Sequence, residues 1–88
     1  DLVVCTDVME HIEPIFVDRV LNSICSLVIK GAYFNIALVK AKRSLPDGRN
    51  AHICLISHEA WLGKLQNYDW RISRYEVGQK SLKVWIKK

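Results

Sequence analysis

Hydrophobic positions in the first forty residues follow two different periods. Residues 2–5, Leu-Val-Val-Cys, are apolar at every position, which is typical of a parallel strand covered on both faces. After a polar segment, apolar side chains recur at steps of three and four residues, and this predicts an amphipathic helix over residues 14–30. Pro14 suits the first helical position, and Gly31 is expected to stop the helix. Residues 32–39 then predict a second buried strand.

The second half of the chain begins with a polar, basic loop over residues 40–50. Ser57 is a good N-cap for a helix over residues 58–67. Residues 70–77 and 81–87 alternate with period two, which predicts an antiparallel hairpin. In its last strand three side chains are expected to face the core and three to face water: Leu82, Val84 and Ile86 inward, and Lys83, Trp85 and Lys87 outward.

This order of elements predicts an α/β fold with a mixed sheet, in which a parallel strand pair is followed by a C-terminal antiparallel hairpin. The first strand is apolar on both faces, yet the sequence supplies a neighbour on only one side, so an edge is exposed. Because the chain enters this strand directly at Asp1, we expect an N-terminal portion of the domain to be missing and to cover that edge.

Composition narrows the class of protein. Eighty-eight residues suffice for one domain, and the apolar runs are too short for a membrane-spanning helix, so no membrane is expected as a partner. Three cysteines, each inside an apolar run, predict buried thiols in a reducing compartment, with the cytoplasm as the expected location. The formal charge of +4 permits a nucleic-acid or phosphate-bearing partner without requiring one.

Residues 1–14, Asp-Leu-Val-Val-Cys-Thr-Asp-Val-Met-Glu-His-Ile-Glu-Pro, resemble the fourth-strand segment of class I S-adenosylmethionine-dependent methyltransferases. The shared pattern is an Asp-led apolar strand, an acidic residue, two apolar positions and Glu-His. The later order of elements agrees over essentially all 88 residues. The resemblance implies a partial Rossmann-like three-layer sandwich, with strands in the spatial order first, second, fourth, third and the last strand inserted antiparallel. It also implies an S-adenosylmethionine-dependent enzyme.

The family's glycine-rich first loop and its acidic second-strand end have no counterpart here. Residues 1–88 therefore look like the C-terminal, substrate-side half of the domain, with the N-terminal cofactor-binding half of the same domain as its missing partner. Such a piece is expected to bind S-adenosylmethionine poorly and to be inactive alone. A non-catalytic assembly module that pairs its open edge with another chain is the second interpretation. A basic nucleic-acid-binding domain that uses residues 40–49 and the lysine tail is the third.

Candidate site residues follow the first strand. Thr6 and Asp7 leave the carboxyl end of a parallel strand, where open α/β sheets bind ligands, although Asp7 could simply cap the following turn. The resemblance places Thr6, Asp7 and Val8 beside the cofactor. It also makes Asp7 and His11 the catalytic candidates, with His11 as a general base.

Asp7, Glu10 and His11 offer three metal donors within five residues, and a helical turn would bring them to one face. The segment resembles the metal site of the small-RNA 2′-O-methyltransferases and of the quinone-biosynthesis O-methyltransferases. By that resemblance His52 would complete a Mg²⁺ or Mn²⁺ site, and His58 suits it less well. The competing interpretation is that Glu10 caps backbone N–H groups while His11 packs beneath the substrate loop.

The loop after the second strand faces the substrate in this family. Arg49, Asn50 and His52, with Arg43 nearby, are therefore candidates for binding an anionic acceptor, either a small molecule or a nucleic acid; a solvated surface loop is the alternative. Trp85 on the wet face of the last strand could cover a neighbouring helix or a partner subunit, and a homo-oligomer is a further expectation.

Overall fold

A computed structural model describes residues 2–88, and its element order confirms the α/β prediction. Four strands, two α-helices and two 3₁₀ turns follow one another in the described chain. Their bounds are β1 (Leu2–Thr6), η1 (Met9–His11), η2 (Pro14–Phe16), α1 (Val17–Leu27), β2 (Gly31–Ala37), α2 (His58–Leu65), β3 (Arg71–Val77) and β4 (Ser81–Lys87).

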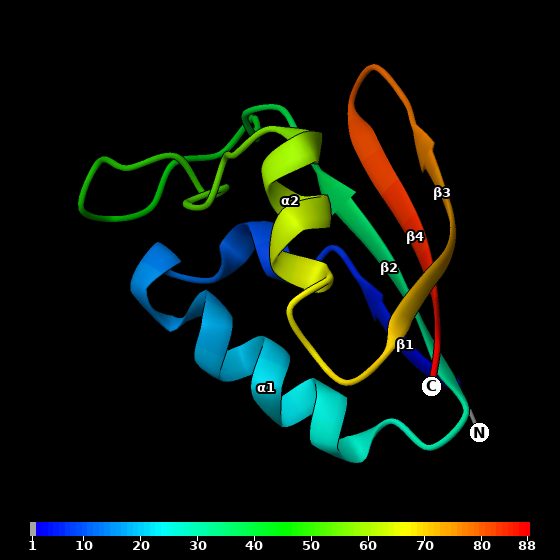
Figure 1. The fold of residues 1–88 in the computed structure, drawn as a ribbon. Coiled ribbons are helices and arrows are strands. Elements are labelled where there is room, and N and C mark those ends of the chain that lie inside the picture. Colours follow the sequence, from blue (N-terminus) through cyan, green and yellow to red (C-terminus); the bar gives the residue numbers. More distant parts are fainter. Residues whose placement is uncertain (1) are drawn as a thin grey trace.

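The strands form a single mixed sheet in the order β1-β2-β4-β3 (Figure 1). β1 and β2 are parallel, and they are joined through α1 as a crossover unit requires. β4 lies antiparallel between β2 and β3. Both the expected strand order and the expected C-terminal hairpin are confirmed. β1 forms one edge of the sheet, so its outer backbone has no strand neighbour among residues 2–88.

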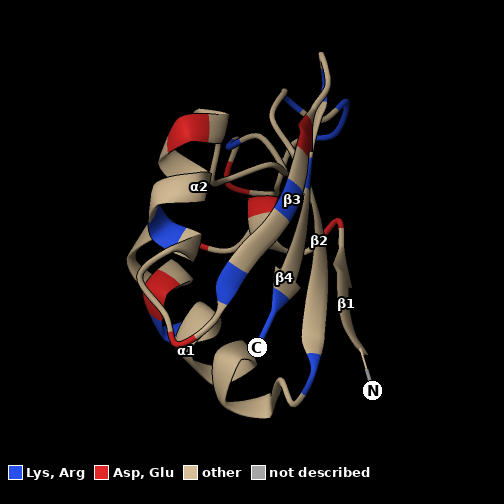
Figure 2. Cartoon of the chain, turned by 45° about the vertical axis from the view of Figure 1, so that its right-hand side comes forward, with Lys and Arg blue, Asp and Glu red and all other residues tan. Residues whose placement is uncertain are grey.

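The two α-helices lie on the same face of the sheet (Figure 2). The core fills the space between them and the inward side chains of β2 and β4, and Leu82, Val84 and Ile86 are buried as expected. Trp61 of α2 is also fully buried. Residues 2–88 thus form two layers, a helical layer and a sheet.

The end of the first helix differs from the prediction. α1 ends at Leu27, and the next residue, Val28, is already extended while its N–H still bonds the carbonyls of Ile24 and Cys25. Gly31 is the first residue of β2 and not a helix stop, which corrects the expectation. A Cβ atom at Gly31 would lie 2.6 Å from the carbonyl oxygen of Ile86, so the close approach of β2 and β4 requires glycine there. Pro14 does open a helical turn, η2.

The three cysteines are free and buried, which confirms their prediction as packed thiols. Burial raises the pKa of the Cys5 thiol and that of the Cys54 thiol, because a thiolate is poorly solvated there. Within residues 2–88, no helix combines the length and the apolar character that a membrane crossing requires.

Candidate metal and proton-transfer site

A left-handed residue separates β1 from the candidate site. Asp7 has φ of 59°, a conformation that aspartate tolerates better than most residues. Its N–H donates to the carbonyl of Asn35 at 3.1 Å, which ties the turn to the carboxyl end of β2. The chain then enters η1 at Met9, so Asp7 precedes the helical turn and does not belong to it.

Glu10 is the central buried polar side chain of the site. It is 1% exposed, and its Oε1 accepts the N–H of Ala37 at 3.3 Å. Its backbone carbonyl accepts the N–H of Cys54 at 3.0 Å. Glu10 therefore joins η1 to the end of β2 and to the returning loop. This is the backbone-capping role that the competing interpretation gave it, but that role occupies only one of the two carboxylate oxygens.

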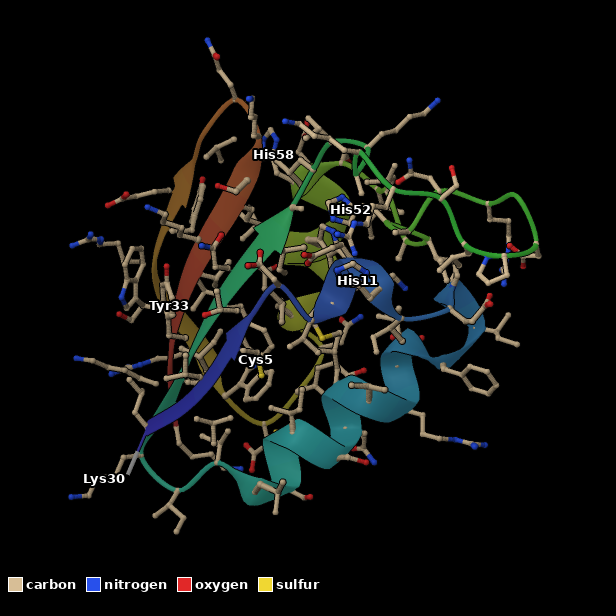
Figure 3. All side chains as sticks on the ribbon, turned by 180° about the vertical axis from the view of Figure 1, so that it is seen from behind. Cys5, His11, Lys30, Tyr33, His52 and His58 are labelled. Atoms are coloured by element: carbon tan, nitrogen blue, oxygen red, sulfur yellow. The ribbon has the colours of Figure 1, made fainter. Side chains whose placement is uncertain are left out.

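The rings of His11 and His52 lie side by side (Figure 3), and each has a nitrogen within 4.8 Å of a carboxylate oxygen of Glu10. Nδ1 of His11 lies 2.9 Å from the carbonyl of Ala51, and Nδ1 of His52 lies 2.6 Å from that of Val39. Since a carbonyl only accepts, each Nδ1 carries the proton, and in a neutral ring Nε2 is then left with its lone pair. The two ring centroids are 4.9 Å apart at an interplanar angle of 74°.

Glu10, His11 and His52 each offer a ligand atom, and these atoms lie within 4.8 Å of one another. Nε2 of His11 is 3.8 Å from Oε2 of Glu10. A positive or hydrogen-bonding partner offsets the cost of burying a charged carboxylate, and a cation between these three side chains would supply one. One carboxylate and two imidazoles suit Mn²⁺ and neighbouring transition ions better than Mg²⁺, which prefers oxygen ligands and water. The side chains present thus fit a transition-metal ion.

The other sequence candidates lie around this cluster. Thr6, Asp7 and Val8 are all exposed at the carboxyl end of β1, but Asp7 is not among the three clustered donors. His58, the less favoured histidine, begins α2, and its Nδ1 faces the carboxylate of Glu59 at 3.2 Å.

The loop candidates Arg49 and Asn50 bind other parts of the protein. Arg49 pairs with Glu13 and with Asp47, each at 2.7 Å. The hydrogen bond to Glu13, followed by that to Asp47, raises the pKa of the guanidinium. Asn50 Oδ1 accepts the N–H groups of Ala41 and His52, both at 2.9 Å. Both side chains thus hold the loop in shape. Among the described residues of this loop, the basic side chains at positions 40–43 form no ion pair.

Sequence reasoning missed three contributors to the site. The carbonyls of Val39 and Ala51 fix the histidine tautomers, and Glu13 anchors Arg49. Backbone carbonyls carry no residue-type pattern, so only the folded loop reveals them. Glu13 could have been suspected as the remaining acidic residue beside Glu-His.

Comparisons with protein-family models, with curated proteins and with solved structures give no match to this chain.

Proposed function

We propose that this chain forms the acceptor side of an S-adenosylmethionine-dependent methyltransferase with a Rossmann-like fold. The observation that carries the proposal is the convergence of Glu10, His11 and His52 just beyond the carboxyl end of the parallel pair β1 and β2. Ligands of open α/β sheets bind at this end of the strands. The exposed residues 6–8 lie next to the cluster in the chain, where the cofactor's methyl end is proposed to sit.

Methyl transfer makes modest demands on such a site. The acceptor oxygen or nitrogen forms a bond to the methyl carbon, the carbon–sulfur bond breaks, and its electron pair returns to sulfur to give the neutral thioether. The acceptor loses one proton, and Nε2 of His11 or His52 is free to take it. The protein otherwise needs to align the two reactants and exclude water.

A transition-metal ion held by Glu10 and by Nε2 of His11 and His52 would be an alternative to the histidine base: it would lower the pKa of an acceptor hydroxyl so that the proton leaves to water, and both imidazoles would then be ligands. Glu10 keeps its backbone bond to Ala37 in this arrangement, and the two carbonyl-bound Nδ1–H groups hold the rings in the required tautomer.

The contacts to the cofactor's ribose and methionine carboxylate are proposed to come from polypeptide outside residues 1–88. The sequence has no glycine-rich strand-to-helix loop, and the outer edge of β1 is available for a further parallel strand. The acceptor is proposed to be a small molecule or a nucleic acid.

Metal binding is tested directly on the 88-residue chain by calorimetric titration with Mn²⁺ and with Mg²⁺. We expect Mn²⁺ to bind the more tightly, and Glu10→Gln, His11→Gln or His52→Gln each to weaken Mn²⁺ binding at least tenfold. His58→Gln is the matched control and should bind as the original chain does. Equal loss in all four variants, or no Mn²⁺ binding, contradicts a metal role for the cluster.

Methyl transfer is tested on the product of the uninterrupted reading frame that encodes these residues. We expect it to bind S-adenosylmethionine, and His11→Gln and His52→Gln to retain that binding while turnover falls by about 10²–10⁴-fold. His58→Gln should retain both properties. A product that does not bind the cofactor rules out the proposed function, whatever the metal titration shows.

A further inference from the structure

The loop after β2 carries three cations next to the candidate site. Lys40, Lys42 and Arg43 are all exposed, and within residues 2–88 none of them forms an ion pair. Arg49, the fourth cation of the loop, is instead paired with two carboxylates. The structure therefore moves the candidate anion-binding group from Arg49 to the residues that follow β2.

The first end of this basic segment, which we define as residues 40–43, lies close to His52 (Figure 3). Val39 immediately precedes the segment, and its carbonyl oxygen is 2.6 Å from Nδ1 of His52. Lys40 is therefore one peptide bond away from a residue that contacts the candidate site.

The second end of the basic segment is tied to His11. The carbonyl of Arg43 accepts the N–H of Ala51 at 3.0 Å, and the carbonyl of Ala51 lies 2.9 Å from Nδ1 of His11. Between the two ends, the side-chain amide of Asn50 bonds the N–H and the carbonyl of Ala41, at 2.9 and 3.0 Å. Because these bonds fix the backbone beside both histidines, an anion that binds the segment does not have to order it.

The charge of the basic segment matches a phosphate group. Three positive charges within four residues repel one another, and a bound anion relieves that repulsion. A phosphate monoester carries about two negative charges near pH 7 and has three oxygens that accept hydrogen bonds. The guanidinium of Arg43 suits two of these oxygens, and the ammonium groups of the two lysines act as point charges.

The same loop lacks the features of a nucleic-acid interface. Residues 40–52 contain no Phe, Tyr or Trp on which a base could stack, and their one histidine belongs to the candidate site. The cations also do not continue as a track along the loop, since Arg49 is neutralised by its carboxylate partners. A compact group of three cations suits a single phosphate better than a polymer of phosphates.

We propose that the methyl acceptor is a small molecule with a phosphate group, and that Lys40, Lys42 and Arg43 bind this phosphate. The acceptor oxygen or nitrogen then lies at the two histidines. This inference rests on the proposed methyl transfer and names the class of its acceptor. The three cations touch the phosphate and not the reacting atoms, so they determine specificity and take no part in bond breaking.

The test uses the product of the uninterrupted reading frame, in buffer with a chelator so that no metal ion captures the probe. The probe is inorganic phosphate, followed by nuclear magnetic resonance. We expect it to shift the backbone amide resonances of residues 40–43.

Charge removal identifies the residues responsible. The double variant Lys40→Gln/Lys42→Gln should bind phosphate about tenfold more weakly. Lys83→Gln/Lys87→Gln removes the same charge from β4 and should bind within about twofold of the original protein. Arg43→Gln provides a second route if the first variant does not fold, and it should weaken phosphate binding as well.

A DNA single strand of about ten nucleotides distinguishes a small acceptor from a nucleic acid. It should bind at most about tenfold more tightly than inorganic phosphate, because it presents several phosphates to one site. Tighter binding than that would make a nucleic acid the acceptor and overturn the small-molecule assignment.

Two further outcomes overturn the inference: phosphate leaves the resonances of residues 40–43 in place, or both double variants lose affinity equally. A parallel titration with S-adenosylmethionine separates this failure from failure of the proposed function. Cofactor binding without phosphate binding refutes only the phosphate-bearing acceptor. Phosphate binding without cofactor binding refutes methyl transfer, and the acceptor assignment with it.

Discussion

Gly31 shows how a single residue sets the distance between two strands. It is buried, and the carbonyl of Ile86 occupies the place where a side chain would begin. The same residue also lines a shallow pocket together with Leu2 and Trp85. Because Gly31 follows the helical pattern, the sequence suggested that it ends the helix. Sequence alone does not tell whether a glycine ends a helix or allows two strands to approach closely.

We expect Gly31→Ala to destabilise the protein by about 1–3 kcal/mol, because the backbone of β4 must move to admit the methyl group. Gly63→Ala is the matched control. A Cβ atom there meets nothing within 4 Å, and the helical propensity of alanine should stabilise α2 by up to about 1 kcal/mol. Urea unfolding measures both variants, and equal midpoints would contradict the close approach at Gly31.

Asp7 illustrates a residue whose neighbours in sequence are not its neighbours in the site. A helical turn beginning at Asp7 would have placed it on one face with Glu10 and His11. The left-handed turn at Asp7 and the later start of η1 break that periodicity. The pairing of Glu10 with His11 could be predicted from their sequence, whereas the contribution of His52 rested on a family resemblance and is supplied by the loop.

At the scale of elements, hydrophobic periodicity predicted the strands, the helices and the side of β4 that faces the core. The long loop between β2 and α2 carries no such periodicity, so its path could not be predicted. Specific bonds fix that path: Asn50 closes residues 41–52, and Arg49 joins the loop to Glu13. These bonds hold His52 beside His11.

The ion pairs of Arg49 with Asp47 and Glu13 predict a pH effect in this loop. Hydrogen bonds from the backbone N–H and then the side chain of Arg49 lower the pKa of Asp47. A lowered folded-state pKa stabilises the fold at pH values above the ordinary aspartate pKa, and that contribution disappears as the pH falls through the lowered value. Arg49→Gln should therefore raise the titration midpoint of Asp47, measured by nuclear magnetic resonance. Lys42→Gln removes a charge from the same loop and should leave the midpoint nearly unchanged. Equal shifts of the Asp47 midpoint in both variants would contradict a specific interaction between Arg49 and Asp47.

At the scale of the whole molecule, one core connects the sheet and both helices. Cys5, Cys25 and Cys54 come from β1, α1 and the returning loop, and all three thiols belong to this core. Their burial was predictable, because each stands in an apolar run. The exposure of Leu2 and Val4 was not, because a strand that is apolar at every position predicts burial on both faces.

We expect all three thiols to react slowly with a disulfide reagent in the folded protein and rapidly once denaturant unfolds the chain. The thiolate is the reactive form, and burial raises the pKa of Cys5 and of Cys54. The rates should rise together at the denaturant concentration where the fold is lost. A thiol that reacts at the rate of free cysteine in native buffer would place it outside the core.

The position of β4 between β2 and β3 has a consequence for synthesis on the ribosome. β2 is a central strand, yet its second neighbour consists of residues 81–87, which are made some fifty positions later. Until those residues leave the exit tunnel, β2 carries a bare edge and the buried row of β4 is absent. The core is therefore completed only once β4 has emerged, and β2 stays paired on one side alone while some fifty further residues are made.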